Sequence, residues 1–136
     1  MINPIEHART KEAANKYKVE PYVISGDVYG TGNLAGRGGW TWYTGSSSWM
    51  YKAGIEYILG LKIRKNVLSI EPCIPKDWKE YSIRYKYKTS VYNIKVKNLN
   101  MKNTGIEEFI VNGEKIEEKQ IKLIDNGRIY EIEVIM

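Results

Sequence analysis

Residues 81–97 have the sequence YSIRYKYKTSVYNIKVK, in which aromatic and aliphatic side chains alternate with polar ones. Such alternation has the period of a β-strand with one buried face and one solvated face. In the first run, Tyr81, Ile83, Tyr85 and Tyr87 share one face. In the second run, Tyr92, Ile94 and Val96 do the same. The stretch therefore predicts two adjacent strands.

The same pattern continues to the end of the chain, in short runs separated by turn residues. Asn112-Gly113 is a typical hairpin pair, and Asp125-Asn126-Gly127 marks another turn. A last alternating run covers residues 130–134. Several short strands at this spacing, beginning at Val67, predict an antiparallel β-sandwich that resembles a jelly roll.

The first part of the chain has a different character, which changes near residue 62. The sequence predicts a short helix at Ala8–Lys18, an extended segment at 19–29, a glycine-rich loop, and a second helix at 46–61 that ends at Gly60. This second helix is so apolar that it needs burial on most of its sides, which one sandwich face could not easily cover, so the sequence indicates neighbours outside this chain. The predicted fold class is α+β, with one part at 1–62 and a sandwich at 63–136.

Composition excludes several functional classes. The 21 basic and 16 acidic residues are interspersed, which argues against nucleic acid as a partner. Cys73 and His7 are the single cysteine and histidine, so one chain has no internal disulfide or Cys/His zinc site, and we expect no metal. The sequence contains no apolar run of membrane-spanning length, and we expect a cytoplasmic location.

The stretch whose residues most suggest a ligand-binding site is GRGGWTWYTGS at residues 36–46. Gly45 allows a ligand to approach the backbone, and the helix that follows presents unpaired N–H groups at the positive end of its dipole. With the Thr44 hydroxyl, these groups form a candidate site for phosphate. The alternative is an ordinary capped helix start.

Aromatic and charged residues near this stretch suggest a sugar site. Trp40 and Trp42 lie on one side of an extended segment, where indole rings could stack on sugar rings or pack in a core. Glu20 and Asp27 could form the carboxylate pair of sugar-transfer chemistry or simple salt bridges. Arg37 adds a positive charge close to the candidate phosphate site.

Several motifs together closely resemble the C-terminal region of glycoside hydrolase family 94. They are NPIEHART at 3–10, YKVEPYV at 17–23, GRGGWTWYTG at 36–45, residues 54–61, IEPCIP at 70–75, and Asp77-Trp78. The likeness spans essentially the whole chain and is strongest over residues 2–78. The RGGW stretch favours the branch of cyclic β-1,2-glucan synthases and β-1,2-oligoglucan phosphorylases.

The resemblance implies an (α/α)6 barrel followed by a β-sandwich, and inverting cleavage of β-glucosidic bonds by phosphate. This chain would then supply the last two barrel helices. The family's phosphate-binding threonine and glycine correspond to Thr44 and Gly45. Its general-acid aspartate and phosphate-binding histidine fall upstream of Met1, so His7 does not inherit a role and no catalytic residue is expected here. The chain alone is therefore expected to be inactive.

The same resemblance sets the expected partners. These are a β-glucan oligosaccharide, inorganic phosphate as co-substrate without another cofactor, and either the missing barrel portion or a second copy of the chain. It also allows a membrane anchor elsewhere in the parent protein. Two alternatives stay open: a non-catalytic glycan-binding or scaffolding module, and an RNA-binding protein that uses RYKYK at 84–88.

Overall fold

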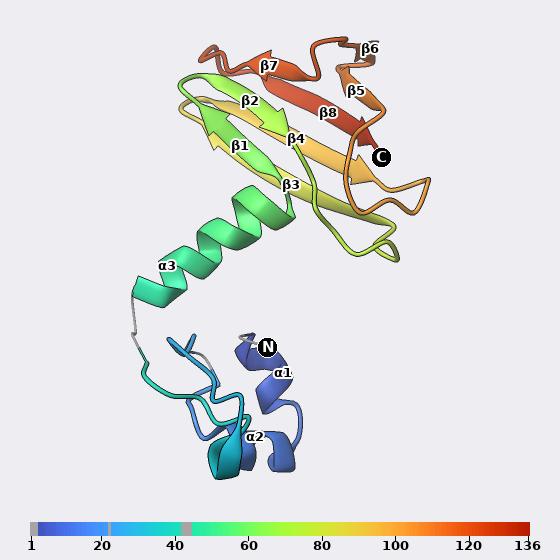
Figure 1. Cartoon of the computed structure of the whole chain (residues 1–136). Helices are drawn as coiled ribbons and strands as arrows, with labels where there is room; N and C mark the ends of the chain where they lie inside the picture. The colour runs from blue at the N-terminus through green and yellow to red at the C-terminus, as the bar shows by residue number, and fades with distance from the viewer. Residues whose placement is uncertain (1–2, 22, 42–44) are drawn as a thin grey trace. The chain divides into compact units, whose positions relative to one another are not determined.

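The computed structural model describes residues 3–21, 23–41 and 45–136. The chain divides into two compact units, Met1–Ala53 and Gly54–Met136, which are described separately (Figure 1). The first unit contains short helices and loops, and the second contains two β-sheets. The α+β prediction is confirmed, whereas membership of helices in an (α/α)6 barrel stays a prediction.

Two short helices open the first unit, in place of the single predicted helix at Ala8–Lys18. They are α1 (Pro4–Ala8) and α2 (Lys11–Tyr17). The predicted start at Ala8 is wrong because Thr10 adopts an extended conformation and its Oγ1 accepts the Ala13 N–H at 3.1 Å, which caps a new helix. Lys18, with a left-handed φ of 54°, ends α2 as expected.

Tyr17 is the centre of packing in the first unit. Its side chain is 1% exposed, and its hydroxyl lies 2.9 Å from Ser25 Oγ, which is also buried. The His7 ring stacks on the Tyr17 ring with centroids 4.0 Å apart. These contacts attach α1 and α2 to the loop that follows, which contains the 3-10 turn Gly32–Leu34.

The second predicted helix forms as α3 (Gly45–Lys52), which continues as a π-helix at Ala53–Ile58. Gly60, with φ of +76°, follows its end as predicted. The described residues do not cover all of this apolar helix: Trp49, Tyr51 and Tyr57 are 74%, 73% and 62% exposed. Sequence periodicity identified the apolar side chains correctly, but the described residues leave this helix with exposed aromatic rings.

The second unit contains two sheets. The smaller sheet has the order β1-β2-β7, formed by Leu61–Arg64, Val67–Ile70 and Gln120–Lys122. The larger sheet has the order β3-β4-β8-β5-β6, formed by Glu80–Tyr87, Ser90–Lys97, Ile129–Ile135, Glu108–Val111 and Glu114–Lys115. The two alternating runs at 81–97 are thus β3 and β4, paired antiparallel as neighbours.

One strand pair corrects the prediction of a purely antiparallel sandwich. β8 runs parallel to β4, with Tyr92 opposite Tyr130 and Ile94 opposite Ile132. On its other edge β8 is antiparallel to β5, so the larger sheet is mixed. Alternation along a strand determines which side chains face the core, but it does not determine the partner or its direction. The long connection from residue 98 to 128 makes a parallel return possible.

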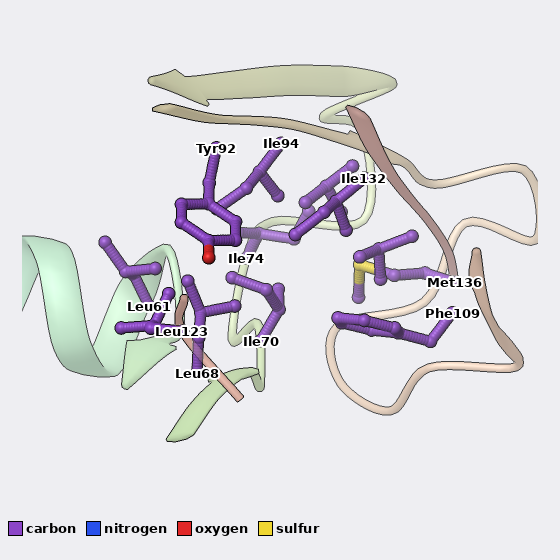
Figure 2. Close-up of a cluster of buried hydrophobic side chains, with 12 residues drawn as sticks. Leu61, Leu68, Ile70, Ile74, Tyr92, Ile94, Phe109, Leu123, Ile132 and Met136 are labelled. Carbon is purple, nitrogen blue, oxygen red and sulfur yellow. The ribbon is translucent and has the colours of Figure 1, made fainter. Parts of the chain in front are cut away.

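A continuous apolar core is formed by side chains from both sheets (Figure 2). Leu68 and Ile70 come from the smaller sheet, and Tyr92, Phe109 and Ile132 come from the larger one. All five are at most 2% exposed. The face assignments made from alternation are therefore correct, and this unit has the two-sheet packing of a sandwich.

Charged side chains of the larger sheet pair across neighbouring strands. Lys95 Nζ lies 3.1 Å from Glu80 Oε2, and Lys97 Nζ lies 2.8 Å from Glu133 Oε2. The Tyr85 and Tyr87 side chains are partly buried and pack against the core, which leaves less of their rings exposed for the RNA-binding role of residues 84–88. The interspersed charge thus belongs to solvated strands.

Candidate functional site

The glycine-rich loop of the first unit folds back on the segment before it. Two isolated antiparallel bridges join Ser25 to Thr41 and Val28 to Gly38. Just beyond the second bridge, toward the tip of the loop, Tyr29 N–H donates to the Arg37 carbonyl oxygen at 2.9 Å. The loop is therefore an irregular hairpin, and this pairing gives residues 36–41 a defined backbone path.

Two glycines of this hairpin are required by close packing. A Cβ atom at Gly38 would lie 2.3 Å from Val19 Cγ2, and one at Gly39 would lie 2.2 Å from Asp27 Oδ1. The same Asp27 oxygen accepts the Trp40 backbone N–H at 2.9 Å. Asp27 therefore holds the backbone of Trp40 across the hairpin, and Gly39 leaves room for its carboxylate.

A hollow of about 410 Å³ lies on this hairpin. Its lining comprises Asp27, Tyr29, Leu34, Arg37, Gly38, Gly39 and Trp40. The Trp40 indole is 69% exposed, so its ring is available to a ligand. An aromatic surface beside a carboxylate and a guanidinium is suited to a sugar, since stacking and hydroxyl hydrogen bonds can act together.

The structure brings together only some of the predicted site residues. Arg37 and Trp40 line the same hollow. Glu20 is partly buried and does not belong to the lining of this hollow. Gly45 is the first residue of α3, as the phosphate prediction requires. Trp42 and Thr44 lie outside the described residues.

Sequence interpretation missed two lining residues and gave a third another role. Tyr29 and Leu34 were not predicted, and Asp27 was considered only as a partner of Glu20. The available signal was Asp27 and Tyr29 at alternate positions of an extended segment, which places both on one side of it. Only the fold-back of the loop shows that this side faces Arg37 and Trp40.

Within residues 3–21, 23–41 and 45–136, no group of three or more His, Cys, Asp or Glu side chains is placed so that it could hold a metal ion. In the same ranges, no helix has the length and apolar character needed to cross a membrane.

Two family models match consecutive parts of the chain. Residues 1–60 match the catalytic domain of the glycosyl hydrolase 94 superfamily, and residues 61–101 match the C-terminal domain of glycosyl hydrolase family 65. These matches define a family of carbohydrate-active proteins that includes glycoside phosphorylases. The chain belongs to glycoside hydrolase family 94, in its C-terminal region.

Named relatives belong to the same group. The cyclic β-(1,2)-glucan synthase NdvB of Rhizobium meliloti is 49% identical over 96 residues, which are 71% of this chain and 3% of that protein. Solabiose phosphorylase of Paenibacillus borealis is 30% identical over 118 residues, 86% of this chain and 15% of that enzyme. N,N'-diacetylchitobiose phosphorylase of Vibrio proteolyticus is 35% identical over 117 residues, 85% and 14% of the two chains. The chain thus spans a small fraction of each relative, and the predicted division after residue 62 stays a prediction.

Proposed function

We propose that the chain is the C-terminal part of an inverting glycoside phosphorylase or glycosyltransferase that acts on β-glucans, of the cyclic β-1,2-glucan synthase type. The observation that carries this proposal is the hollow that joins Arg37 and Trp40 on the hairpin before Gly45. Family membership and the phosphorylase names of the relatives support the proposed reaction type.

Phosphate is the proposed co-substrate, with no other cofactor. Thr44 would donate its hydroxyl, and Gly45 would donate a backbone N–H at the beginning of α3. The first N–H groups of a helix lack partners within the helix and lie at the positive end of its dipole, so they favour an oxyanion. In an inverting phosphorylase, this phosphate attacks the anomeric carbon directly.

The glucan is proposed to contact the hollow through the Trp40 ring, with Arg37 close to the phosphate. Trp42 and Glu20 are retained as further pocket residues from the sequence prediction. Asp27 instead positions Trp40, because its carboxylate accepts that residue's backbone N–H. We assign the general acid to none of the residues of this chain, so we expect no catalysis by this chain alone.

A graft tests this proposal. Residues of solabiose phosphorylase that align with this chain would be replaced by the chain itself, and cleavage of solabiose would be measured with and without phosphate. We expect phosphate-dependent cleavage, with Trp40→Ala raising the KM for the sugar about tenfold because the ring no longer stacks on it. A stable graft that binds solabiose but never cleaves it would instead support the glycan-binding module.

The chain alone is expected to self-associate through α3. Trp49 and Tyr51 are each more than 70% exposed, and covering such a side chain contributes roughly 1.5–3 kcal/mol. Light scattering at increasing concentration should show a rising average mass. The double variant Trp49→Ser/Tyr51→Ser should stay closer to a monomer, whereas Trp78→Ser, in the second unit, should not. A monomer at every concentration would contradict the expectation.

A further inference from the structure

The second unit has a hollow of its own, with a volume of about 640 Å³. Its walls come from the end of the π-helix, from β1 and β2, and from the segments at 71–73, 104–106 and 118–120. All of these segments belong to Gly54–Met136. The hollow is therefore separate from the loop site of the first unit.

We propose that this hollow is a second carbohydrate site, which binds a neutral saccharide without cleaving it. The ligand class follows from the side chains and backbone groups of the hollow itself. It does not depend on the function proposed for Arg37, Trp40 and Gly45.

Two lysines and two glutamates line the hollow, so their formal charges cancel, and three of these four side chains already make hydrogen bonds in the structure. This balance favours a neutral ligand over an ionic one. Lys62 Nζ donates to Glu71 Oε2 at 2.5 Å, and Ser69 Oγ donates to Glu71 Oε1 at 3.4 Å. Lys119 Nζ donates to the Ile106 carbonyl oxygen at 2.8 Å. A phosphate or a cation would have to compete with these contacts, whereas a hydroxyl group can join them as donor or acceptor.

The remaining lining has the two components of a saccharide site. The Tyr57 ring, 62% exposed, offers a flat apolar surface with a polar edge. Thr104 and Gln120, both exposed lining residues, offer a hydroxyl and an amide for hydroxyl groups of a sugar. A volume of about 640 Å³ is within the usual range for small-molecule sites.

The walls are held by backbone contacts, so the site exists before a ligand binds. Glu71 N–H donates to the Gly60 carbonyl oxygen at 2.8 Å, and Cys73 N–H donates to the Ile58 carbonyl oxygen at 2.9 Å. Asn103 Nδ2, next to the lining residue Thr104, donates to the Ile74 carbonyl oxygen at 2.9 Å. A preformed site loses little entropy when it binds.

Cys73 provides a direct test, because it is the single cysteine of the sequence, is exposed, and lines the hollow. The alkylation rate of Cys73 in the full chain would be measured with a maleimide, with and without linear β-1,2-gluco-oligosaccharides. We expect a saturating oligosaccharide to slow alkylation at least about fivefold. Sorbitol and inorganic phosphate at the same concentrations should not slow it.

Substitutions in the two hollows show which of them is responsible for the protection of Cys73. Tyr57→Ala should abolish protection and Tyr57→Phe should retain it, while Trp40→Ala, which alters the loop site, should leave protection unchanged. Circular dichroism would check the fold, and Gln120→Ala is the second variant if Tyr57→Ala unfolds. Unchanged alkylation at saturating oligosaccharide would overturn the proposal, as would loss of protection in Trp40→Ala. Neither result would depend on phosphorolysis, so failure here is distinct from failure of the proposed function.

Discussion

Replacing Gly60 with alanine is expected to lower the free energy of unfolding of the Gly54–Met136 unit by about 3–4 kcal/mol. Two effects add. Gly60 has a φ of +76°, which an alanine adopts only with strain. Its Cβ atom would also lie 2.2 Å from the Glu71 carbonyl carbon, and backbone cannot rotate away as a side chain can. The substitution would therefore force apart the end of the helix and the segment after β2.

Urea denaturation followed by far-UV circular dichroism measures this loss of stability. Gly127→Ala is the matched control, because Gly127 has a similar φ of +71° but no atom within 4 Å of a built Cβ. The control should lose only the conformational part, about 1–2 kcal/mol. Equal losses in the two variants would show that the approach to Glu71 does not matter.

Thr44→Ala is expected to lower kcat/KM for phosphate about 10- to 100-fold in the solabiose phosphorylase graft. A hydrogen bond to a charged group contributes about 1.5–3 kcal/mol, which corresponds to that range. The KM for the sugar should change little, since the hydroxyl is proposed to contact phosphate alone. Thr31→Ala is the control: Thr31 is an exposed residue of the same unit, next to the 3-10 turn.

An unchanged dependence on phosphate in Thr44→Ala would remove the threonine from the proposed pocket. A proportional loss for both substrates and for Thr31→Ala would indicate damage to the fold. The comparison of the two threonines therefore separates a ligand contact from a structural effect.

The sequence predicted the elements of the second unit well because its strands have one buried and one solvated face. Tyr92, Ile94 and Val96 are buried as their alternation requires. Asn112 and Gly113 both have positive φ and connect β5 to β6, as the hairpin pair predicts. In each case a local pattern is sufficient, since side-chain direction and turn geometry depend on neighbouring residues.

Strand partners and short helices were predicted less well because they depend on contacts that are distant in sequence or on a single cap. The parallel pairing of β4 with β8 joins residues such as Val91 and Ile129. The interruption between α1 and α2 depends on the Thr10 hydroxyl, which competes with a continuous helix. Hydrophobic periodicity predicts neither the strand partner nor the helix interruption.

The loop site was also predicted only in part, because some of its residues are placed by contacts distant in sequence. Arg37 and Trp40 were identified by residue type and by their place near Gly45, and the structure puts them in one hollow. Asp27 acts through a hydrogen bond to a residue on the other side of the hairpin, and Tyr29 lines the hollow for the same reason. The fold-back that creates these contacts depends on Gly39, whose missing side chain makes room for Asp27.

An electron-density map of the solabiose phosphorylase graft, crystallised in phosphate, tests the central claim most directly. The account predicts a phosphate ion at the beginning of α3, within hydrogen-bond distance of Thr44 Oγ1 and Gly45 N. A map with no ion at this position, and with the first amide groups of α3 already bonded within the protein, would contradict it.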